Sequence, residues 1–394
     1  MKFVVLITDG ASGWAVDAFG GRTSLEAAEL PNLDRLAREG TVGLAHTVPR
    51  GMEPSSAVAC MSVLGYDPCR YYAGRGPIEA VALGIELEPE QAALRCNLVT
   101  VIDGVMRSYA AGGIPSSESH VLIKAIQSEL GDARVRFHSG VGFRHILTVR
   151  HGRHMLETEC TPPHDLADQP VDGHLPVGPG ADLLLDLMER SKPILADHAV
   201  NKRRTERGEP PATQIWPFWP GLRPDALPSF HECFGVRAAV TSAVDLLRGI
   251  ARQVSMSVLE IPGVTDGTDN DYAAQMEGAL DSLEEHDLVV VHVEAPDATG
   301  HAGDAEGKRE SLEHIDRLMV EPLARLGRGV RVLVMPDHPT PLAIKTHTAE
   351  PVPFILWGEG FEPNGAAAFT EAAASATGLE IAHGNSLMGR LLGR

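Results

Sequence analysis

A carboxylate and an imidazole follow a strongly hydrophobic segment late in the chain. Residues 289–294, VVVHVE, are mostly β-branched, which predicts a strand buried on both faces of a parallel sheet. Asp297 comes in the turn expected after this strand, and His301 follows four residues later. Open α/β sheets carry their chemistry at the carboxyl ends of strands, so this pair could bind one metal ion. The alternative is an aspartate that caps a turn and a histidine on a loop.

Two further hydrophobic segments, 3–8 and 330–335, are followed by residues of the same types. These residues are Asp9, Asp337, His338 and, further along, His347. Mixed carboxylate and imidazole ligands suit Mn²⁺ or Zn²⁺. The whole set suffices for two ions, and two ions ~4 Å apart can stabilise the attacking and leaving oxygens of a phosphoryl transfer.

Segment 54–56, PSS, contains the candidate nucleophile. The segment predicts a loop that leads into a helix over residues 57–64. Ser56 would lie at the helix N-terminus, where free backbone N–H groups favour a phosphoryl group. Coordination to a cation would lower the pKa of its hydroxyl and activate it. The alternative is that Ser55 and Ser56 only cap the helix.

Composition narrows the class of protein. The chain has 394 residues and a formal net charge of -19, which is long for one domain and favours two. No basic stripe interleaved with aromatic residues indicates nucleic-acid binding. No apolar stretch approaches the ~20 residues of a membrane span, and the N-terminal apolar run is too short for a signal peptide. The five cysteines lack CxxC spacing, so we expect reduced thiols in a cytoplasmic protein.

The pattern of the sequence changes between residues 76 and 230. Short strand-like pieces alternate with Gly/Pro turns there, whereas regular strand–helix alternation fills the flanking segments. We therefore expect an α/β core with a doubly wound sheet, formed by residues 1–75 and 231–394, and a smaller α+β cap domain inserted over 76–230. Within the core the pattern predicts helices over 31–39, 243–252, 270–285 and 308–326 and a strand over 257–261.

Ten short motifs run nearly from end to end: TDG, PNLDRLAREG, LGYDP, GRGPIEA, RCNLVTVIDGVM, TPPHD, SAVDLLRGI, HVEAPDATGHAGD, PDHPTP and KTHTAEPVPF. Together they resemble the archaeal-type 2,3-bisphosphoglycerate-independent phosphoglycerate mutase family, which belongs to the alkaline phosphatase superfamily. The resemblance implies an alkaline-phosphatase-like core. It also implies interconversion of 3-phosphoglycerate and 2-phosphoglycerate through a phosphoserine, without 2,3-bisphosphoglycerate as a cofactor.

The resemblance further implies two divalent metal ions, with Mn²⁺ favoured and Mg²⁺, Co²⁺ or Zn²⁺ as alternatives. The ligands would be Asp297, His301 and His347 for one ion, and Asp9, Ser56, Asp337 and His338 for the other. Ser56 would take the phosphoryl group from one glycerate hydroxyl. It would return the group to the other hydroxyl after the glycerate has turned inside the closed cap.

The region of the nucleophile departs from the family pattern. The family usually shows Gly-Ser-Asp, whereas this chain has Ser55, Ser56 and Ala57. The change removes a possible basic partner of Ser56 and makes Ser55 a rival. Bacterial relatives proposed to phosphorylate homoserine share the same motifs. A phosphotransferase acting on homoserine or another small alcohol therefore stays open, as do a phosphomonoesterase and a non-catalytic metal-binding regulatory or interaction module.

Several cationic residues could bind the phosphate or carboxylate of a small phosphorylated substrate. The candidates are Arg75, Arg95, Arg144, His164 and Lys345. For Arg75 and Lys345 the alternative is a solvated side chain. His292 lies inside the strand over 289–294 and is expected to be a core histidine rather than a ligand.

Overall fold

The computed structural model describes residues 1–72, 74–223, 227–326 and 329–394. Contacts divide the chain into two compact units. Met1–Tyr72 together with Ala226–Arg394 form one, here called the core unit, and Ala73–Asp225 form the other, here called the cap unit. The boundaries expected from the sequence were 75/76 and 230/231. Each unit buries a large hydrophobic cluster of its own, as a domain does.

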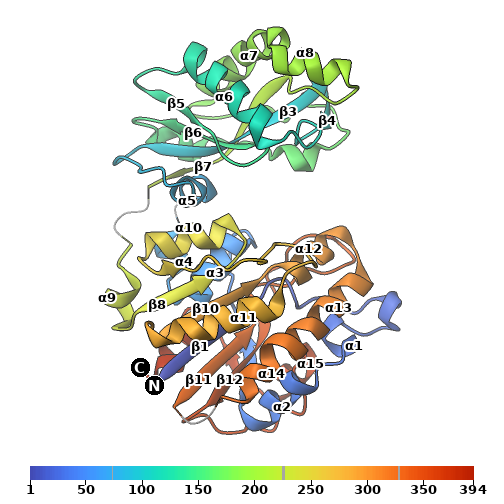
Figure 1. Ribbon diagram of the computed structural model, residues 1–394, viewed down its shortest axis with the longest axis vertical. Coiled ribbons are helices and arrows are strands. Elements are labelled where there is room, and N and C mark those ends of the chain that lie inside the picture. The colour runs from blue at the N-terminus through green and yellow to red at the C-terminus, as the bar shows by residue number, and fades with distance from the viewer. Residues whose placement is uncertain (73, 224–226, 327–328) are drawn as a thin grey trace. The chain divides into compact units, whose positions relative to one another are not determined.

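An eight-stranded sheet forms the centre of the core unit (Figure 1). Across the sheet its strands are β13 (Glu380–Ile381), β2 (Thr41–Ala45), β12 (Val352–Gly358), β11 (Val330–Met335), β1 (Lys2–Thr8), β10 (Leu288–Val293), β8 (Ala238–Thr241) and β9 (Ser257–Val258). β12 runs antiparallel to β11 and β2, and the other neighbours pair in parallel. The three strands predicted to lead into the site, β1, β10 and β11, are therefore neighbours at the centre of the sheet.

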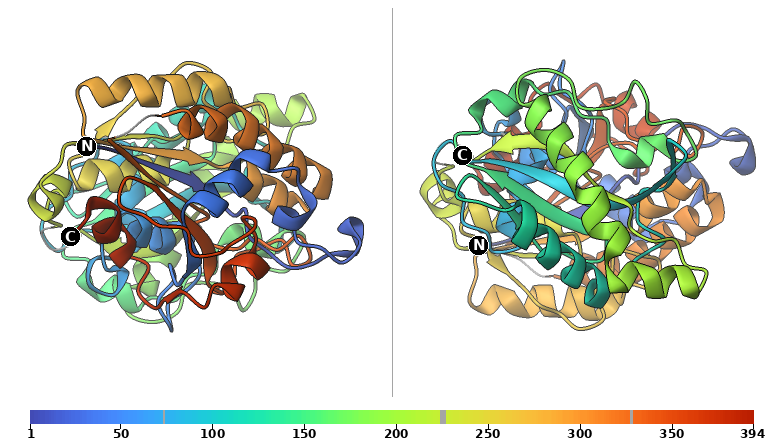
Figure 2. Two further views of the ribbon diagram at one scale, coloured as in Figure 1. Left: turned by 90° about the horizontal axis from the view of Figure 1, so that it is seen from below. Right: turned by 90° about the horizontal axis from the view of Figure 1, so that it is seen from above.

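The helices of the core unit are α1 (Ser24–Ala27), α2 (Pro31–Glu39), α3 (Ser56–Val63), α4 (Pro68–Tyr71), α9 (Phe230–Phe234), α10 (Asp245–Gln253), α11 (Tyr272–Asp281), α12 (Ala295–Ala302), α13 (Ala305–Ile315), α14 (Glu321–Ala324), α15 (Glu371–Ala376) and α16 (Ser386–Leu392). On one face of the sheet, Leu33 of α2, Met276 of α11 and Leu312 of α13 are buried in one cluster with Val4 and Val289. On the other face α3 packs against α10 and α16. Figure 2 shows α16 beside the C-terminus, on the opposite side of the strands from α11. The sheet is thus covered on both faces, as predicted.

Two predicted helices are shorter than expected. The segment 308–326 contains the end of α13, a π-helical turn η5 (Asp316–Val320) and α14. Pro322 lies in the first turn of α14 and has no N–H to donate to the preceding turn, which accounts for the interruption. Likewise 270–285 contains α11 and a 3₁₀ turn, η4 (Ser282–Glu284). The strand predicted over 257–261 is only the two residues of β9.

The cap unit combines an antiparallel sheet with helices. Its strands are β3 (Ala92–Ile102), β4 (Val105–Ser108), β5 (Val135–His138), β6 (Arg144–Val149) and β7 (Gln214–Leu222), and β3 pairs with β4, β6 and β7. Its helices are α5 (Arg75–Ala82), α6 (Ser116–Leu130), α7 (Ala181–Asp197) and α8 (Ala199–Glu206). Along β3, Leu94 faces the cluster under α6 and α7, whereas its neighbour Ala93 packs with Ala80 of α5. An α/β core with an α+β insert is the predicted fold class, which is confirmed.

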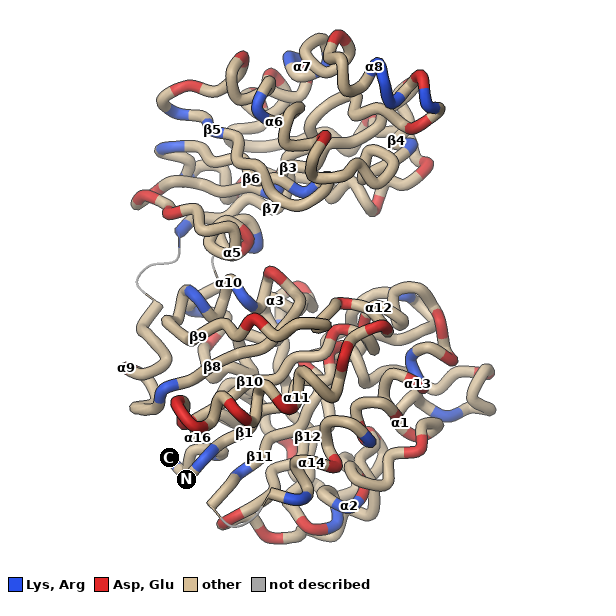
Figure 3. Tube along the Cα trace, in the orientation of Figure 1, with Lys and Arg blue, Asp and Glu red and all other residues tan. Residues whose placement is uncertain are grey.

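Charged residues of both signs are interspersed along both units (Figure 3). All five cysteines lie in the described part of the chain, and each is a free thiol. Across the described ranges, no helix has both the length and the apolar character needed to cross a bilayer.

Candidate functional site

The carboxyl ends of β1, β10 and β11 bring the predicted aspartates to one edge of the sheet. β1 pairs in parallel with both other strands, so all three strands end at the same edge of the sheet. Asp9 follows β1, Asp297 lies in α12 just after β10, and Asp337 follows β11. Their exposed fractions are 0%, 3% and 0%. Buried carboxylates at close quarters call for cations, because an uncompensated buried charge is costly.

Asp297, His301 and His347 form one half of the site. Asp297 and His301 share a face of helix α12, so the predicted turn and loop are wrong at this point. Nε2 of His301 lies 3.2 Å from Oδ2 of Asp297, and Nε2 of His347 lies 3.4 Å from its Oδ1. The two Nε2 atoms are 2.8 Å apart. Nδ1 of His301 donates to the backbone oxygen of Lys345 at 2.9 Å, which leaves the lone pair of the neutral ring on Nε2.

The pKa of Asp297 lies well below its usual range. Burial by itself would raise the pKa of this carboxyl, but its contacts with His301 and His347 outweigh the burial. Its partner responds in the opposite sense, since the contact with Asp297 raises the pKa of His301. Asp297 is therefore ionised, as a metal ligand must be.

Asp9, Asp337 and His338 form the other half of the site, together with Ser56. Nε2 of His338 lies 3.6 Å from Oδ1 of Asp9, 3.3 Å from Oδ2 of Asp337 and 3.1 Å from Oγ of Ser56. Burial lowers the pKa of His338 to about 4, so its ring is neutral. Burial, followed by the charge of Asp337, raises the pKa of Asp9. Oδ1 of Asp9 is buried and has no hydrogen-bond partner among the described residues.

These donors fit divalent cations. Ligand atoms lie within 4.8 Å of one another in three groups, two of which consist of predicted ligands: Asp297 with His338 and His347, and Asp9 with Asp337 and His338. An unpartnered buried carboxylate oxygen and convergent ring nitrogens both match the needs of a positive ion. Imidazole nitrogen with carboxylate oxygen is a donor set of first-row divalent metals. The chain thus contains groups that could hold metal ions at the predicted residues.

The two serines at the start of α3 differ in role. Ser55 is the N-cap, and its hydroxyl accepts the N–H of Val58 at 3.5 Å. Ser56 is the first helical residue, and its Oγ faces His338. Ala57 is fully buried, so the aspartate of the family pattern would be buried at this position. Asp9, Asp297 and Asp337 at the sheet edge are here called the acidic group. The geometry favours Ser56 over Ser55 as the residue that faces it.

In the cap unit, two predicted arginines bind one carboxylate. Glu79 of α5 accepts from Nε of Arg75 at 2.8 Å and from Nη1 of Arg95 at 2.6 and 2.8 Å. The Arg75 guanidinium also lies over the ring of Trp219, 4.2 Å from its centroid. Burial would raise the pKa of Glu79, but the charges of Arg95 and Arg75 lower it. The alternative of a solvated turn residue is therefore wrong for Arg75.

The other predicted binding residues have looser surroundings. The guanidinium of Arg144 lies 5.5 Å from the ring of Phe143. The ring of His164 packs edge-on against that of Trp219, 5.4 Å away. In the core unit, Lys345 is exposed and adopts φ 57°, and its ammonium donates to the oxygen of Ala302 at 3.2 Å.

Three residues around these carboxylates were given no part in the site from the sequence: His292, which was expected to be a core histidine, Lys308, and Thr340, whose Oγ1 donates to Oδ1 of Asp297 at 2.5 Å. His292 is 2% exposed, and its Nε2 lies 2.7 Å from Oδ2 of Asp9. Lys308 is fully buried, and its ammonium donates to the backbone oxygens of Gly10 and Thr340, both at 2.7 Å. A histidine inside an otherwise apolar strand was a usable signal for His292. Lys308 and Thr340 left none, because each is an ordinary polar residue in its own segment.

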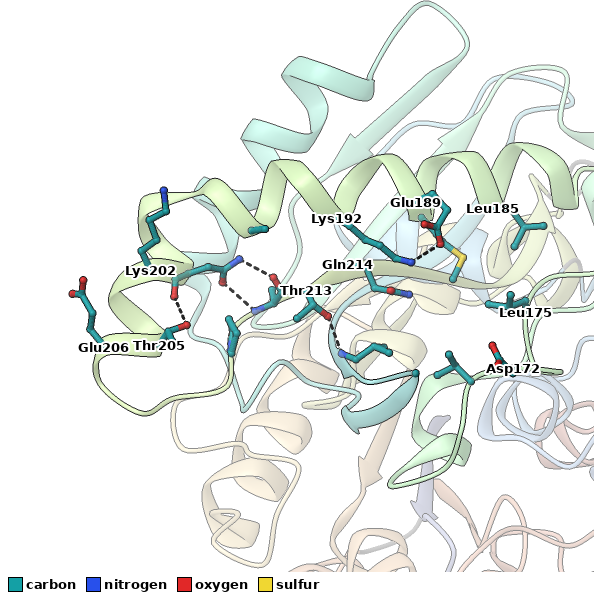
Figure 4. A pocket seen from close by; sticks show the side chains of 18 residues that line it. Asp172, Leu175, Leu185, Glu189, Lys192, Lys202, Thr205, Glu206, Thr213 and Gln214 are labelled. Atoms are coloured by element: carbon teal, nitrogen blue, oxygen red, sulfur yellow. Dashed lines mark hydrogen bonds and ion pairs between the residues drawn. The ribbon is translucent and has the colours of Figure 1, made fainter.

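The cap unit also contains a cavity of about 760 Å³ (Figure 4). Residues of α7, α8 and the start of β7 line it, and Lys192 pairs with Glu189 at its wall. The amide of Asn201 is already satisfied by backbone groups of Leu195 and Ala212. None of the predicted binding residues lines this cavity.

Comparison with known proteins identifies relatives over the full length. Residues 37–201 match the model of the family described as 2,3-bisphosphoglycerate-independent phosphoglycerate mutase. A protein of that name from Methanothrix thermoacetophila is 44% identical, covering 100% of this chain and 99% of the relative. A Geobacter sulfurreducens protein, named a probable enzyme of this type, is 43% identical and covers 100% of both chains. The solved cofactor-independent phosphoglycerate mutase of Thermoplasma acidophilum is 30% identical, with a TM-score of 0.68 and coverage of 100% and 99%. A solved Pyrococcus horikoshii protein is 26% identical, with a TM-score of 0.84 and coverage of 100% and 97%.

Proposed function

Because the chain belongs to the 2,3-bisphosphoglycerate-independent phosphoglycerate mutase family, we propose that it interconverts 3-phosphoglycerate and 2-phosphoglycerate through a phosphoserine at Ser56. The observation that carries the proposal is the position of Ser56. Its Oγ lies at the N-terminus of α3, 3.1 Å from Nε2 of His338, beside the acidic group. We place the reaction in the cytoplasm.

We assign two divalent ions to this site, with Mn²⁺ as the first choice. The ligands are Asp297, His301 and His347 for one ion, and Asp9, Ser56, Asp337 and His338 for the other. Bound there, the ions supply positive charge that lowers the pKa of the serine hydroxyl and stabilises the negative charge of the transferring phosphoryl group. The neutral ring of His338 and the ionised Asp297 are in the protonation states that binding requires.

In this proposal the phosphoryl group passes from the substrate to Ser56 and then back to the glycerate. Oγ of Ser56 attacks the phosphorus and gives up its proton, the bond from phosphorus to one glycerate oxygen breaks, and that oxygen takes up a proton to become a hydroxyl. The phosphoserine lies at the positive end of α3, which favours its negative charge. After the glycerate has turned, its other hydroxyl attacks the same phosphorus and loses its proton, the bond from phosphorus to Oγ of Ser56 breaks, and Oγ takes up a proton to become a hydroxyl again.

We propose that cationic residues predicted from the sequence bind the carboxylate or phosphate of the substrate. Arg75 and Arg95 present guanidinium groups held by Glu79, and such held groups match carboxylates and phosphates bidentately. Arg144 and His164 of the cap unit, and Lys345 of the core unit, are the further candidates. A bound intermediate that cannot leave distinguishes a mutase from a phosphatase, in which water reaches the phosphoserine first.

Turnover of 3-phosphoglycerate coupled to enolase tests the proposal. Activity should appear with Mn²⁺ and disappear with EDTA. Ser56→Ala should remove activity, whereas Ser55→Ala, which removes only an N-cap hydroxyl, should retain it at a stability cost of about 1 kcal/mol. Mass spectrometry after a rapid quench should find phosphate on Ser56.

Two results would overturn this assignment. Full activity of Ser56→Ala, or label on Ser55, would displace Ser56. A metal-loaded protein that leaves both phosphoglycerates unchanged and yet makes phosphohomoserine from a phosphate donor would move the function to the homoserine-directed rival.

A further inference from the structure

His292 contacts one of the carboxylates at the sheet edge from within the sheet. It lies on β10, in register with Ile7 of β1, and is 2% exposed. Its Nε2 is 2.7 Å from Oδ2 of Asp9. Its backbone oxygen is held by the amide of Gln275 at 2.9 Å. The ring therefore contacts Asp9 from a fixed strand rather than from a mobile loop.

The other ring nitrogen has a partner that defines the tautomer. Nδ1 lies 3.0 Å from Oγ of Ser242, and this oxygen also accepts the N–H of Val244 at 3.0 Å. A metal-bound Asp9 is a carboxylate, which can only accept a hydrogen bond, so Nε2 of His292 is the donor to Oδ2. Nδ1 then holds the lone pair and accepts a hydrogen bond from the hydroxyl of Ser242. The resulting chain of donors runs from Ser242 through His292 to Asp9.

The same tautomer decides between two roles for His292. Together with Asp9 and Glu294 it forms a third group whose ligand atoms lie within 4.8 Å of one another. A metal ligand needs a free ring lone pair, however, and both nitrogens of His292 are engaged. Glu294 lies 3.8 Å from Nε2, beyond hydrogen-bond reach. A donor to Asp9 accounts for the contacts of His292 without a third ion.

We propose that His292 is a positioning residue that holds Oδ2 of Asp9, so that Oδ1 is presented to Asp337 and His338. The unpartnered Oδ1 of Asp9, 3.6 Å from Nε2 of His338, is the atom left for the ion. The inference rests on the proposed function, because it requires Asp9 to be a metal ligand. Its effect is confined to that ion and leaves the group of Asp297 and His301 unchanged.

Mn²⁺ binding to the metal-free protein, without substrate, tests the role of His292. In His292→Gln the side-chain amide can replace Nε2–H and donate to Asp9, whereas in His292→Asn it replaces Nδ1 and cannot reach Asp9. His292→Asn should lower the affinity for one of the two ions by about 10–100-fold, the usual effect of removing the hydrogen-bond partner of a metal ligand. His292→Gln should lose much less, and Ser242→Ala should show a smaller loss in the same direction. Electron paramagnetic resonance titration and metal analysis after dialysis measure both ions.

His286→Gln is the matched control, since His286 also pairs with a serine, Ser257, at 2.9 Å but lies away from the acidic group. It should bind both ions as the wild type does. Equal losses in His292→Gln and His292→Asn would show a packing role and overturn the inference, as would unchanged binding in His292→Asn. Three ions in the wild-type protein would make His292 a ligand and overturn it as well. A wild-type protein that binds two ions but has no mutase activity would instead contradict the proposed function.

Discussion

At the scale of residues, the buried ammonium group of Lys308 joins two of the loops that form the site. The ammonium of Lys308 donates to the backbone oxygens of Gly10 and Thr340, and so connects the loops that follow β1 and β11. Gly10 adopts φ +60°, and a Cβ there would lie 2.6 Å from Oγ1 of Thr340 and 2.6 Å from Oδ1 of Asp297. Glycine is therefore required at the point where these loops approach each other. Burial lowers the pKa of Lys308 to about 8, from the ordinary 10.5.

We predict that Lys308 makes the stability of the metal-free protein rise with pH. Between pH 8 and 10.5 the unfolded chain holds the lysine proton and the folded chain has lost it, so raising the pH favours the folded state. The free energy of unfolding of the wild type minus that of Lys308→Met should therefore increase through this window, by roughly 3 kcal/mol at most. Thermal melts in EDTA across this range measure it.

Lys2→Met, at the start of β1 in the same unit, is the control and should show no such growth relative to wild type. The prediction would be contradicted if the free energy of unfolding of the wild type, measured relative to that of Lys308→Met, stayed constant or fell as the pH rises.

At the scale of elements, helix α2 depends on a side chain from a distant segment. Its N-cap, Leu30, provides no side-chain cap. Instead Asp316 of the π turn accepts from the backbone N–H of Leu33 at 2.7 Å and of Asn32 at 3.2 Å. The break in the predicted helix over 308–326 thus provides a carboxylate for the positive end of another helix.

Asp316→Ala should destabilise the core unit by about 1–3 kcal/mol, because buried N–H groups at the start of α2 lose their acceptor. Urea unfolding followed by a probe of the core unit measures the change. Glu310→Ala, an exposed change on α13, should alter stability by less than about 0.5 kcal/mol. Equal effects of the two changes would contradict the capping role.

At the scale of the whole molecule, the chain builds two hydrophobic cores that share no residue. The larger cluster of the core unit contains only residues before 73 or after 225, and that of the cap unit lies between 92 and 222. Units with separate cores are expected to unfold separately unless their interface is large and apolar.

Calorimetry should therefore resolve two transitions, of which only one responds to metal. At a free Mn²⁺ concentration of 100 times the dissociation constant, ions bound to the folded state add about 2.7 kcal/mol per site. This stabilisation should raise the midpoint temperature of the core unit's transition and be lost in EDTA. The midpoint temperature of the cap unit's transition should not change. A single transition that metal shifts as a whole would show instead that the two units unfold as one cooperative body.

Local physics made much of the site readable in advance. The runs before Asp9, Asp297 and Asp337 are β-branched and apolar, which is enough to predict buried strands and the edge at which they end. Proline and serine before residue 57 are enough to predict a helix N-terminus. The motifs added the family, which the full-length relatives confirm. The π turn after α13 and the helical position of Asp297 and His301 were not predicted, because both depend on packing that a local pattern does not contain.

By itself, the sequence determined the three strands that lead into the site, the start of α3 and the residue types available at the sheet edge, since these follow from periodicity and chain chemistry within a few residues. The tertiary structure decided which of these groups meet. Only strand order brings together His292, on β10, and Asp9 and Asp337, which follow the adjacent strands β1 and β11. Only packing separates Ser55, a cap, from Ser56, which faces His338. Such contacts join residues more than 280 positions apart in the sequence, a separation over which the chain has no local preference to express.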